Sequence, residues 1–349
     1  MEKYVEQFIH FLPWDQNGLV AWTGLLVAIA VSLFVLAKSA DSAVTQAVTL
    51  SERSGLPKMV IGATVVSMGT TMPEAAISVL AAIKGQPDLA LGNAVGSIIC
   101  DTGLILGIAA LIAPLPLNRQ IVNRQAWIQL GAGVLLVLAC FPWLAPAKVF
   151  VDGGLLLQIT GFVFLALLGV YMWKSVMWAK LDKGAVATEE VEADTSASSA
   201  VVVVKLILAI AFVVLASNIL IPLVREAAER MHVPPSVIAA TLVAFGTSLP
   251  ELVTAVSAAR RGHGDLAVGN IIGADILNVL FVAGAAAAVT PDGLKAGPVF
   301  FRIFFPGMLF VLIVFRIGIW RSGDSLKRPI GYVLLGAYML VTAAGFLFK

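Results

Sequence analysis

The chain is poor in charge, cysteine and histidine. Only 13% of its 349 residues are Asp, Glu, Lys or Arg, about half the share of roughly 25% in average soluble domains. Its two cysteines, Cys100 and Cys140, both fall in apolar stretches, which argues against a disulfide framework. The three histidines, His10, His232 and His263, lie far apart in the sequence and form no zinc-binding cluster. The composition is therefore typical neither of a soluble domain nor of a zinc-bound or disulfide-rich protein.

Signals for several other protein classes are also missing. The net charge is +2, and no basic run interleaved with aromatic residues indicates a nucleic-acid partner. The first residues, MEKYVEQFIH, include acidic side chains and no cationic segment before an apolar core, so they favour an interfacial lead-in over a signal peptide. No His motif, Ser–His pair or protease-type Asp pair indicates an intramembrane hydrolase. We therefore expect neither an enzyme nor a cofactor, and no obligatory protein partner is evident.

Long apolar stretches dominate what is present. Hydrophobic residues make up 59% of the chain, its mean hydropathy is +0.96, and many stretches reach the ~20 residues that cross a hydrocarbon core of ~30 Å. The sequence predicts an all-α integral membrane protein in a lipid bilayer. Hydropathy places ten transmembrane helices at 17–38, 58–83, 87–113, 125–146, 152–178, 201–224, 234–259, 266–289, 297–320 and 328–348.

Two halves of the chain repeat one another. The acidic, small and polar segment 181–200 is a predicted linker between an N-terminal repeat at 1–180 and a C-terminal repeat at 201–349. A shift of 177 positions aligns GTTMPE with GTSLPE, and KGQPDLALGNAVGSIICD with RGHGDLAVGNIIGADILN, without a gap. Because each half has five predicted spans, equivalent helices cross the membrane in opposite directions. The sequence therefore predicts two inverted five-helix repeats.

The distribution of basic residues predicts the orientation. With the N-terminus outside, most of the 23 Lys and Arg residues fall in inside loops and at the adjoining ends of spans. The positive-inside rule then places both termini outside and the linker in the cytoplasm. The expected location is the inner (plasma) membrane, crossed several times.

The repeated phrase places a glutamate inside a span. Glu74 and Glu251 each follow a proline, and no Lys or Arg occurs at a similar depth in the same span. A carboxylate near the bilayer centre costs at least about 2.5–3.5 kcal/mol on insertion scales and normally marks an ion pathway or a charge pair. Each proline also deprives the carbonyl four residues earlier of its helical partner, at Gly69 and Gly246. Two such carboxylates therefore indicate a bound cation or protons, with a structural hydrogen bond between helices as the alternative.

Further oxygen atoms surround each glutamate. Hydroxyl groups of Thr70, Thr71, Thr247 and Ser248 stand beside the two proline breaks. Carboxylates, freed carbonyls and hydroxyls are the hard ligands that Ca²⁺ binds in sets of six to eight, and Na⁺ is of similar size. The hydroxyls can instead bond back to their own helix.

The next span in each half, at 87–113 and 266–289, is predicted to line the other side of the same site. Pairs of glycines four residues apart, at 92/96 and 269/273, allow close helix packing. One helical stripe carries Asn93, Ser97 and Asp101. Its equivalent in the second half carries Asn270, Ala274 and Asn278. The two asparagines that open these stripes can line the ion path or cap the broken helix ends.

These two segments resemble the paired α-repeats of the cation/calcium exchanger superfamily, above all the prokaryotic sodium/calcium exchangers. The family pattern is G-T-S-x-P-E followed by G-N-x-x-G-S-x-x-x-N or -D, and the resemblance covers nearly the whole chain. It implies a calcium site made by Glu74, Glu251, Thr70 and Thr247, and a middle position lined by Asp101 and Asn278. It also implies flanking sodium sites, one with Thr71, Ser97 and the Ser67 carbonyl, the other with the Ala244 carbonyl, Ser248 and position 274.

This sequence departs from the family pattern at three places. Asp101 and Asn278 exchange the usual order of Asn and Asp between the repeats, and Ala274 stands where the pattern has serine. Asp275 is an additional acid, about 100° from Ala274 on the helix, which reaches the ion path or faces a neighbouring helix. We expect an antiporter that exchanges Ca²⁺ for Na⁺. Ca²⁺/H⁺ antiport is the alternative, because Ala274 has lost a sodium-type ligand, and a cation channel is less compatible with an inverted repeat.

Overall fold

Helices make up nearly all of the computed structural model, which describes residues 19–181, 198–231 and 246–347. The described helices are α2 (Leu19–Ser54), α3 (Lys58–Ile61), α4 (Ser67–Thr70), α5 (Met72–Ile83), α6 (Pro87–Ile99), α7 (Leu106–Ile112), α8 (Arg119–Cys140), α9 (Gln158–Leu181), α10 (Ser199–Arg230), α13 (Leu249–Arg260), α14 (Gly264–Leu277), α15 (Gly284–Ala288), α16 (Phe305–Arg321) and α17 (Arg328–Leu347). Four π-helical turns, η1 (Gly62–Val66), η2 (Cys100–Ile105), η6 (Asn278–Ala283) and η7 (Phe300–Phe304), continue these helices, and η3 (Pro146–Lys148) is a short 3₁₀ turn.

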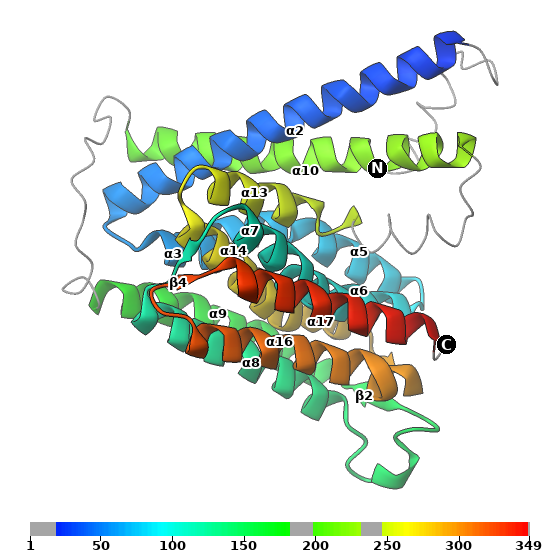
Figure 1. The fold of residues 1–349 in the computed structure, drawn as a ribbon. Coiled ribbons are helices and arrows are strands. Elements are labelled where there is room, and N and C mark those ends of the chain that lie inside the picture. Colours follow the sequence, from blue (N-terminus) through cyan, green and yellow to red (C-terminus); the bar gives the residue numbers. More distant parts are fainter. Residues whose placement is uncertain (1–18, 182–197, 232–245, 348–349) are drawn as a thin grey trace.

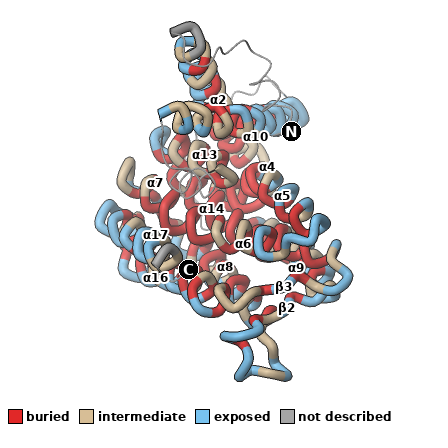
Figure 2. Tube along the Cα trace, turned by 90° about the vertical axis from the view of Figure 1, so that its right-hand side faces the viewer, coloured by how far each residue is buried: buried red, intermediate tan, exposed pale blue. Residues whose placement is uncertain are grey.

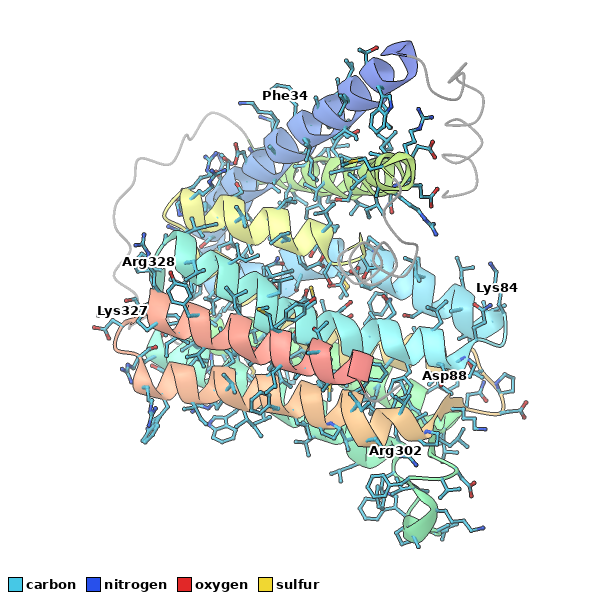
Figure 3. All side chains as sticks on the ribbon, turned by 45° about the vertical axis from the view of Figure 1, so that its right-hand side comes forward. Phe34, Lys84, Asp88, Arg302, Lys327 and Arg328 are labelled. Carbon is cyan, nitrogen blue, oxygen red and sulfur yellow. The ribbon has the colours of Figure 1, made fainter. Side chains whose placement is uncertain are left out.

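The lengths of these helices suit a bilayer. Seven described helices are long and apolar enough to cross a membrane, and the bent pair 58–70 and 72–83 would make an eighth. The predicted span at 234–259 begins outside the described residues, so the count of ten stays a prediction. The labelled charged residues lie at the two ends of the bundle, with Lys84, Asp88 and Arg302 at one end and Lys327 and Arg328 at the other (Figure 3).

Several predicted span limits are wrong. Helix α2 was expected to end near residue 38, yet it continues without a break to Ser54. Asp41 is therefore an interior residue of this helix, and it accepts a hydrogen bond from the Ser257 hydroxyl of α13 at 2.6 Å. Helix α8 begins at Arg119 instead of 125, and α10 extends to Arg230 instead of 224. A polar partner from another helix makes helical structure possible where the sequence alone favoured a loop.

Helix α14 forms the centre of the molecule. All of its residues except Asp265 are buried, and it contacts α3, η1, α4, α8 and α13. Figure 2 shows the buried residues concentrated around it, with exposed residues on the outer helices. A helix that is apolar on every side belongs in such a core.

Helices α2 and α10 form a separate pair at one side of the bundle. They run alongside each other (Figure 1) and make most of their contacts with one another. Their buried residues Leu36, Ala40 and Val213 belong to a small apolar cluster, while Val44 of α2 and Leu206 of α10 belong to the main core. The pair therefore packs partly on itself and partly on the bundle.

Two short antiparallel ribbons join the halves of the chain. Strand β1 (Leu115–Pro116) pairs with β4 (Ser325–Leu326), and β2 (Gly154–Leu156) pairs with β3 (Leu294–Ala296). Strand β3 precedes α16 and β4 follows it, so a helical segment about 33 Å long (22 residues at 1.5 Å each) separates the ribbons. Each ribbon takes one strand from each half, as expected of two repeats related by an approximate two-fold axis.

Candidate functional site

Each glutamate of the repeated phrase lies in the first turn of a short helix. The helix that contains residues 58–70 ends at Thr71, and α5 continues at an angle of 45° with Pro73 and Glu74 in its first turn. Helix α13 begins in the same way, with Pro250 and Glu251 in its first turn. Because the free N–H groups at a helix N-terminus favour negative charge, both breaks suit a carboxylate.

Four carboxylates gather in the buried centre of the molecule. Glu74, Asp101 and Glu251 are each 1% exposed, and Asp275 is 2% exposed. Glu251 and Asp101 both lie within electrostatic range of Glu74, and Asp275 lies within range of Asp101. Among the described residues, no salt bridge involves any of the four. Uncompensated negative charge in a dry interior is costly, so this centre favours a cation.

Most oxygens of these carboxylates lack a hydrogen-bond donor. Within the described part of the chain, no hydrogen bond of 3.5 Å or less reaches either oxygen of Glu74 or of Asp101, Oε2 of Glu251 or Oδ1 of Asp275, although the Thr247 hydroxyl lies near Glu74 and the Ser248 hydroxyl near Asp101. The same is true of four neutral oxygens, the hydroxyls of Ser67, Ser97 and Ser248 and Oδ1 of Asn278. Buried polar atoms are normally satisfied, so a cluster of orphaned oxygens is the feature expected of an ion site.

The hydroxyls of one half face the glutamate of the other half. Thr71 donates a hydrogen bond to Glu251 Oε1 at 3.4 Å, and Thr70 also lies beside this carboxyl. Thr247 in turn comes close to the Glu74 carboxyl. Thr70 additionally bonds back to the Ser67 carbonyl at 3.4 Å, so the alternative of local back-bonding is realised there. The two proline breaks therefore approach each other and share their oxygen atoms.

Asp101 and Asn278 lie in two π-helical turns that correspond to each other in the two halves. Asp101 is the second residue of η2, and Asn278 is the first residue of η6. Both side chains are 1% exposed. Wide π turns occur often at functional sites, and no sequence signal indicated them here.

Two glycines of α14 allow it to pack closely against the helical segment 58–70, which ends at the first proline break. A Cβ at Gly269 would lie 2.1 Å from the Met59 carbonyl oxygen, and one at Gly273 would lie 2.5 Å from Ala63 and 2.7 Å from Ser67 Oγ. The close packing predicted for this glycine pair is confirmed. At Gly92 and Gly96 no described atom comes nearer than 3.9 Å, and the segment equivalent to η1 lies outside the described residues.

The two asparagines of the stripes have different surroundings. Asn93 donates to the Glu74 carbonyl at 3.1 Å and to Ser78 Oγ at 3.0 Å. Position 255, the equivalent of Ser78, is alanine, and both amide atoms of the buried Asn270 lack a partner. Asn93 is therefore a bracing residue, whereas the Asn270 amide makes no hydrogen bond with the described residues.

Asp275 faces two polar residues that the sequence did not single out. Its Oδ2 accepts hydrogen bonds from the Thr102 hydroxyl of η2 and from Gln129 Nε2 of α8, the latter at 2.5 Å. Gln129 was expected near the end of a span, but the earlier start of α8 moves it about 15 Å into the helix. Only the three-dimensional packing brings these groups together.

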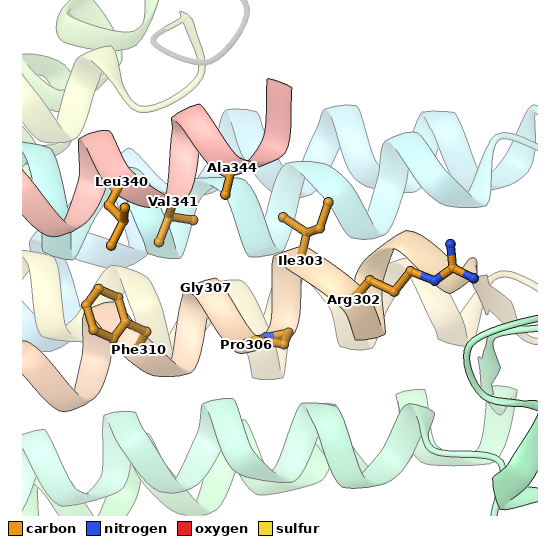
Figure 4. A pocket seen from close by; sticks show the side chains of 8 residues that line it. All are labelled: Arg302, Ile303, Pro306, Gly307, Phe310, Leu340, Val341 and Ala344. Atoms are coloured by element: carbon orange, nitrogen blue, oxygen red, sulfur yellow. The ribbon is translucent and has the colours of Figure 1, made fainter. Parts of the chain in front are cut away.

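Ala244, whose carbonyl was predicted to contribute to a sodium site, lies outside the described residues. Within the described ranges, no three Asp, Glu, His or Cys side chains converge closely enough to bind a metal as a group, so any cation would use hydroxyl, amide and carbonyl oxygens too. A groove of about 550 Å³ lies elsewhere, between α16 and α17, where Arg302, Phe310 and Leu340 line it (Figure 4).

Known proteins resemble this chain along most of its length. The family described as "Sodium/calcium exchanger protein" matches residues 24–177 and 201–347. The chain is 33% identical over 322 residues to the inner membrane protein YrbG of Escherichia coli (strain K12), covering 91% of this chain and 94% of that protein. It is 30% identical over 337 residues to the sodium/calcium exchanger MaX1 of Methanosarcina acetivorans, with 88% and 94% covered.

A solved structure shares the fold. The sodium-calcium exchanger NCX_Mj, soaked with 10 mM Na⁺ and no Ca²⁺, superposes with a TM-score of 0.74 at 26% sequence identity. The match covers 92% of this chain and 98% of that structure. Sequence and fold therefore point to the same group of membrane proteins.

Proposed function

Because this chain belongs to the sodium/calcium exchanger family, we propose that it is a secondary active antiporter that exchanges Ca²⁺ for Na⁺ by alternating access. The observation that carries the proposal is the pair Glu74 and Glu251. Both are buried in the first turn of a broken helix, and both keep at least one oxygen without a partner. Thr71 of the first half contacts Glu251 of the second, which suits a site enclosed between two inverted repeats.

The negative charges of the two glutamates match the double positive charge of Ca²⁺. Ca²⁺ carries two charges and takes six to eight oxygens at about 2.3–2.6 Å. Glu74 and Glu251 would supply the charge, and Thr70 and Thr247 would supply neutral oxygens. Asp101 and Asn278 would line the middle of the path.

Sodium would occupy positions beside the glutamates. Thr71, Ser97 and the Ser67 carbonyl would form one such position, and Ser97 Oγ is buried without a partner. Ser248 and the Ala244 carbonyl would form the other. Because Na⁺ and Ca²⁺ would then share the two carboxylates, binding of one ion would weaken binding of the other, which is the basis of exchange.

The proposed topology is ten transmembrane helices in two inverted five-helix repeats, at 1–180 and 201–349. The ribbons β1–β4 and β2–β3 at opposite ends of the bundle support it, since each takes one strand from each half. We place the protein in the inner (plasma) membrane, with both termini outside and the linker 181–200 in the cytoplasm. No cofactor and no obligatory partner protein are proposed.

Ca²⁺/H⁺ antiport is the second candidate. The buried Ala274 lacks the hydroxyl that its equivalent Ser97 offers, so one sodium position is weakened. The two candidates predict different driving forces for the same cargo.

Transport by the purified protein in liposomes separates them. Vesicles loaded with Na⁺ and diluted into Na⁺-free medium with ⁴⁵Ca²⁺ should accumulate calcium rapidly, and vesicles with equal Na⁺ on both sides should not. A pH gradient alone, with K⁺ as the only other cation, should drive little uptake. Uptake that is driven by the pH gradient and does not depend on Na⁺ would contradict Ca²⁺/Na⁺ exchange and support Ca²⁺/H⁺ antiport.

A further inference from the structure

Asp275 is a buried carboxylate that has no role in the proposed calcium site around Glu74 and Glu251. It is the twelfth residue of the 25-residue span Gly264–Ala288, close to its middle, and it is 2% exposed. No salt bridge of the described residues involves it. An acid at this depth requires a specific reason.

The geometry fixes one oxygen of Asp275 and leaves the other free. Oδ2 accepts from Thr102 and from Gln129 Nε2 at 2.5 Å, and Gln129 also donates to Thr102 Oγ1 at 3.0 Å. Oδ1 is buried and accepts no hydrogen bond from any described residue. Two neutral donors orient the carboxylate but do not neutralise its charge.

Two further side chains with oxygens that lack a partner lie near Asp275. Asn278 lies three residues later on the same helical face, and its Oδ1 is buried without a donor. Asp101 is the neighbour of Thr102 in η2, and it lies within electrostatic range of Asp275 with both oxygens unpartnered. The Asp275 carboxylate thus neighbours Asp101 and Asn278, the two residues that line the middle of the proposed ion path.

The cluster, which joins Asp275 of the second half to Thr102 and Gln129 of the first, has no symmetric counterpart. A shift of 177 positions replaces Asp275 by Ile98, Thr102 by Val279 and Gln129 by Pro306. The residue that precedes Asp275 is Ala274, the position that has lost the hydroxyl of Ser97. The half that lacks a sodium-type hydroxyl is therefore the half that gains a carboxylate.

We propose that Asp275 is a ligand for a sodium ion and takes over the position that Ala274 leaves without a hydroxyl, with Thr102 and Gln129 as positioning residues. The inference rests on the proposed Ca²⁺/Na⁺ exchange and adds one ligand to it. A carboxylate binds Na⁺ more strongly than a hydroxyl, because it contributes a full charge in a region of low dielectric constant. The two halves would then hold sodium by different chemistry.

A purely structural role is the rival explanation. In that case Asp275 would only tie α14 to α8 and η2 through its two hydrogen bonds. The substitution Asp275→Asn distinguishes the two roles, since the amide oxygen can accept both bonds while the charge is lost. Asp265→Asn is the matched control, because it makes the same change in the first turn of α14, about 15 Å away.

The experiment measures ²²Na⁺ and ⁴⁵Ca²⁺ binding to the purified protein, together with Na⁺-driven ⁴⁵Ca²⁺ uptake into liposomes. In Asp275→Asn we expect one Na⁺ fewer per protein and a half-saturating Na⁺ concentration raised at least about tenfold, the loss of one charged ligand. Ca²⁺ affinity in Na⁺-free buffer should stay within about twofold. The double variant Ala274→Ser/Asp275→Asn should recover part of the Na⁺ affinity, and Asp265→Asn should match the unaltered protein.

The outcomes separate this inference from the proposed function. Unchanged Na⁺ binding and unchanged Na⁺ dependence in Asp275→Asn would overturn the sodium role, even though exchange itself remained. A fall in thermal stability alone, with normal Na⁺ dependence, would assign Asp275 to the structural role. If the unaltered protein neither binds Na⁺ nor responds to a Na⁺ gradient, the proposed exchange fails first and this inference fails with it.

Discussion

The hydroxyl of Thr71 lies 3.4 Å from Oε1 of Glu251, so the broken helix of one half contacts the carboxylate of the other. The two residues are 180 positions apart in the chain and both are buried. If the proposed ion site is correct, a contact of this kind makes it a property of the two halves together.

Thr71→Val should weaken the response to Na⁺ without unfolding the protein. Valine keeps the shape of threonine but removes the hydroxyl, and an uncharged hydrogen bond contributes about 0.5–1.5 kcal/mol. We expect the half-saturating Na⁺ concentration for ⁴⁵Ca²⁺ uptake to rise roughly two- to tenfold. Thr71→Ser, which restores the hydroxyl, should behave like the unaltered protein; an equal defect in both variants would contradict the hydroxyl's role.

Glu74→Gln and Glu251→Gln should abolish transport and preserve the fold. Loss of one partner of a buried charge interaction costs about 3–5 kcal/mol, which is more than a hundredfold in ion affinity. An unpaired buried carboxylate also destabilises the ion-free protein, so the neutral amide should keep or raise its Tm in buffer without Ca²⁺ or Na⁺. Ca²⁺ should raise the Tm of the unaltered protein but not that of either variant.

The measurement is a thermal unfolding curve in detergent, with and without Ca²⁺, alongside ⁴⁵Ca²⁺ uptake. Full uptake by either variant would remove that glutamate from the proposed site. A Ca²⁺-dependent rise in Tm in both variants would place the calcium site elsewhere.

Gly269→Ala should be strongly destabilising. The added methyl would lie 2.1 Å from the Met59 carbonyl oxygen, which is backbone and has no easy way to move. Overpacking typically costs about 1–3 kcal/mol. Gly131→Ala in α8 is the control, because no described atom lies within 4 Å of its Cβ position. The Tm of the two variants in detergent tests this, and equal Tm values would contradict the close crossing of α14 and the first broken helix.

His263 should make stability depend on pH at one end of α14. Burial, followed by the nearby Lys58 ammonium, lowers the pKa of His263 from its ordinary value of 6.5, and Lys58 Nζ lies 3.5 Å from its Nδ1. The unfolded chain therefore takes up the proton more readily than the folded protein. The contribution of His263 is complete above pH 6.5 and is lost as the pH falls through the lowered pKa.

The Tm of the unaltered protein should consequently fall more steeply on acidification below pH 6.5 than the Tm of His263→Gln. Comparing the two proteins cancels the effect of carboxylates that titrate in the same range. Parallel curves would show that the His263 imidazole does not contribute.

The sequence predicted the membrane class, the family and the close packing at Gly269 and Gly273. These features depend on local composition, on repetition of a phrase and on small residues, all of which are visible in one dimension. It did not predict the continuation of α2 to Ser54. Polar residues such as Asp41 and Thr45 lower the local hydropathy, and they find partners in Ser257 of α13 and in Arg261, which directly follows α13.

The surroundings of the acids could not be read from the sequence either. The π turns that hold Asp101 and Asn278 have no compositional signal. Thr102 and Gln129 were missed because their importance comes from meeting Asp275, which is 173 and 146 positions away. Side chains from three helices must be in place before such a cluster exists.

The two cross-half ribbons have a mechanical consequence. The ribbons β1–β4 and β2–β3 join the halves at both ends of the bundle. The halves therefore cannot separate from each other as two rigid bodies. The α2–α10 pair has a small apolar cluster of its own besides its contacts with the main core, and it is not held by either ribbon. We therefore expect the ion path to open on one side or the other by displacement of this pair over a frame that stays still.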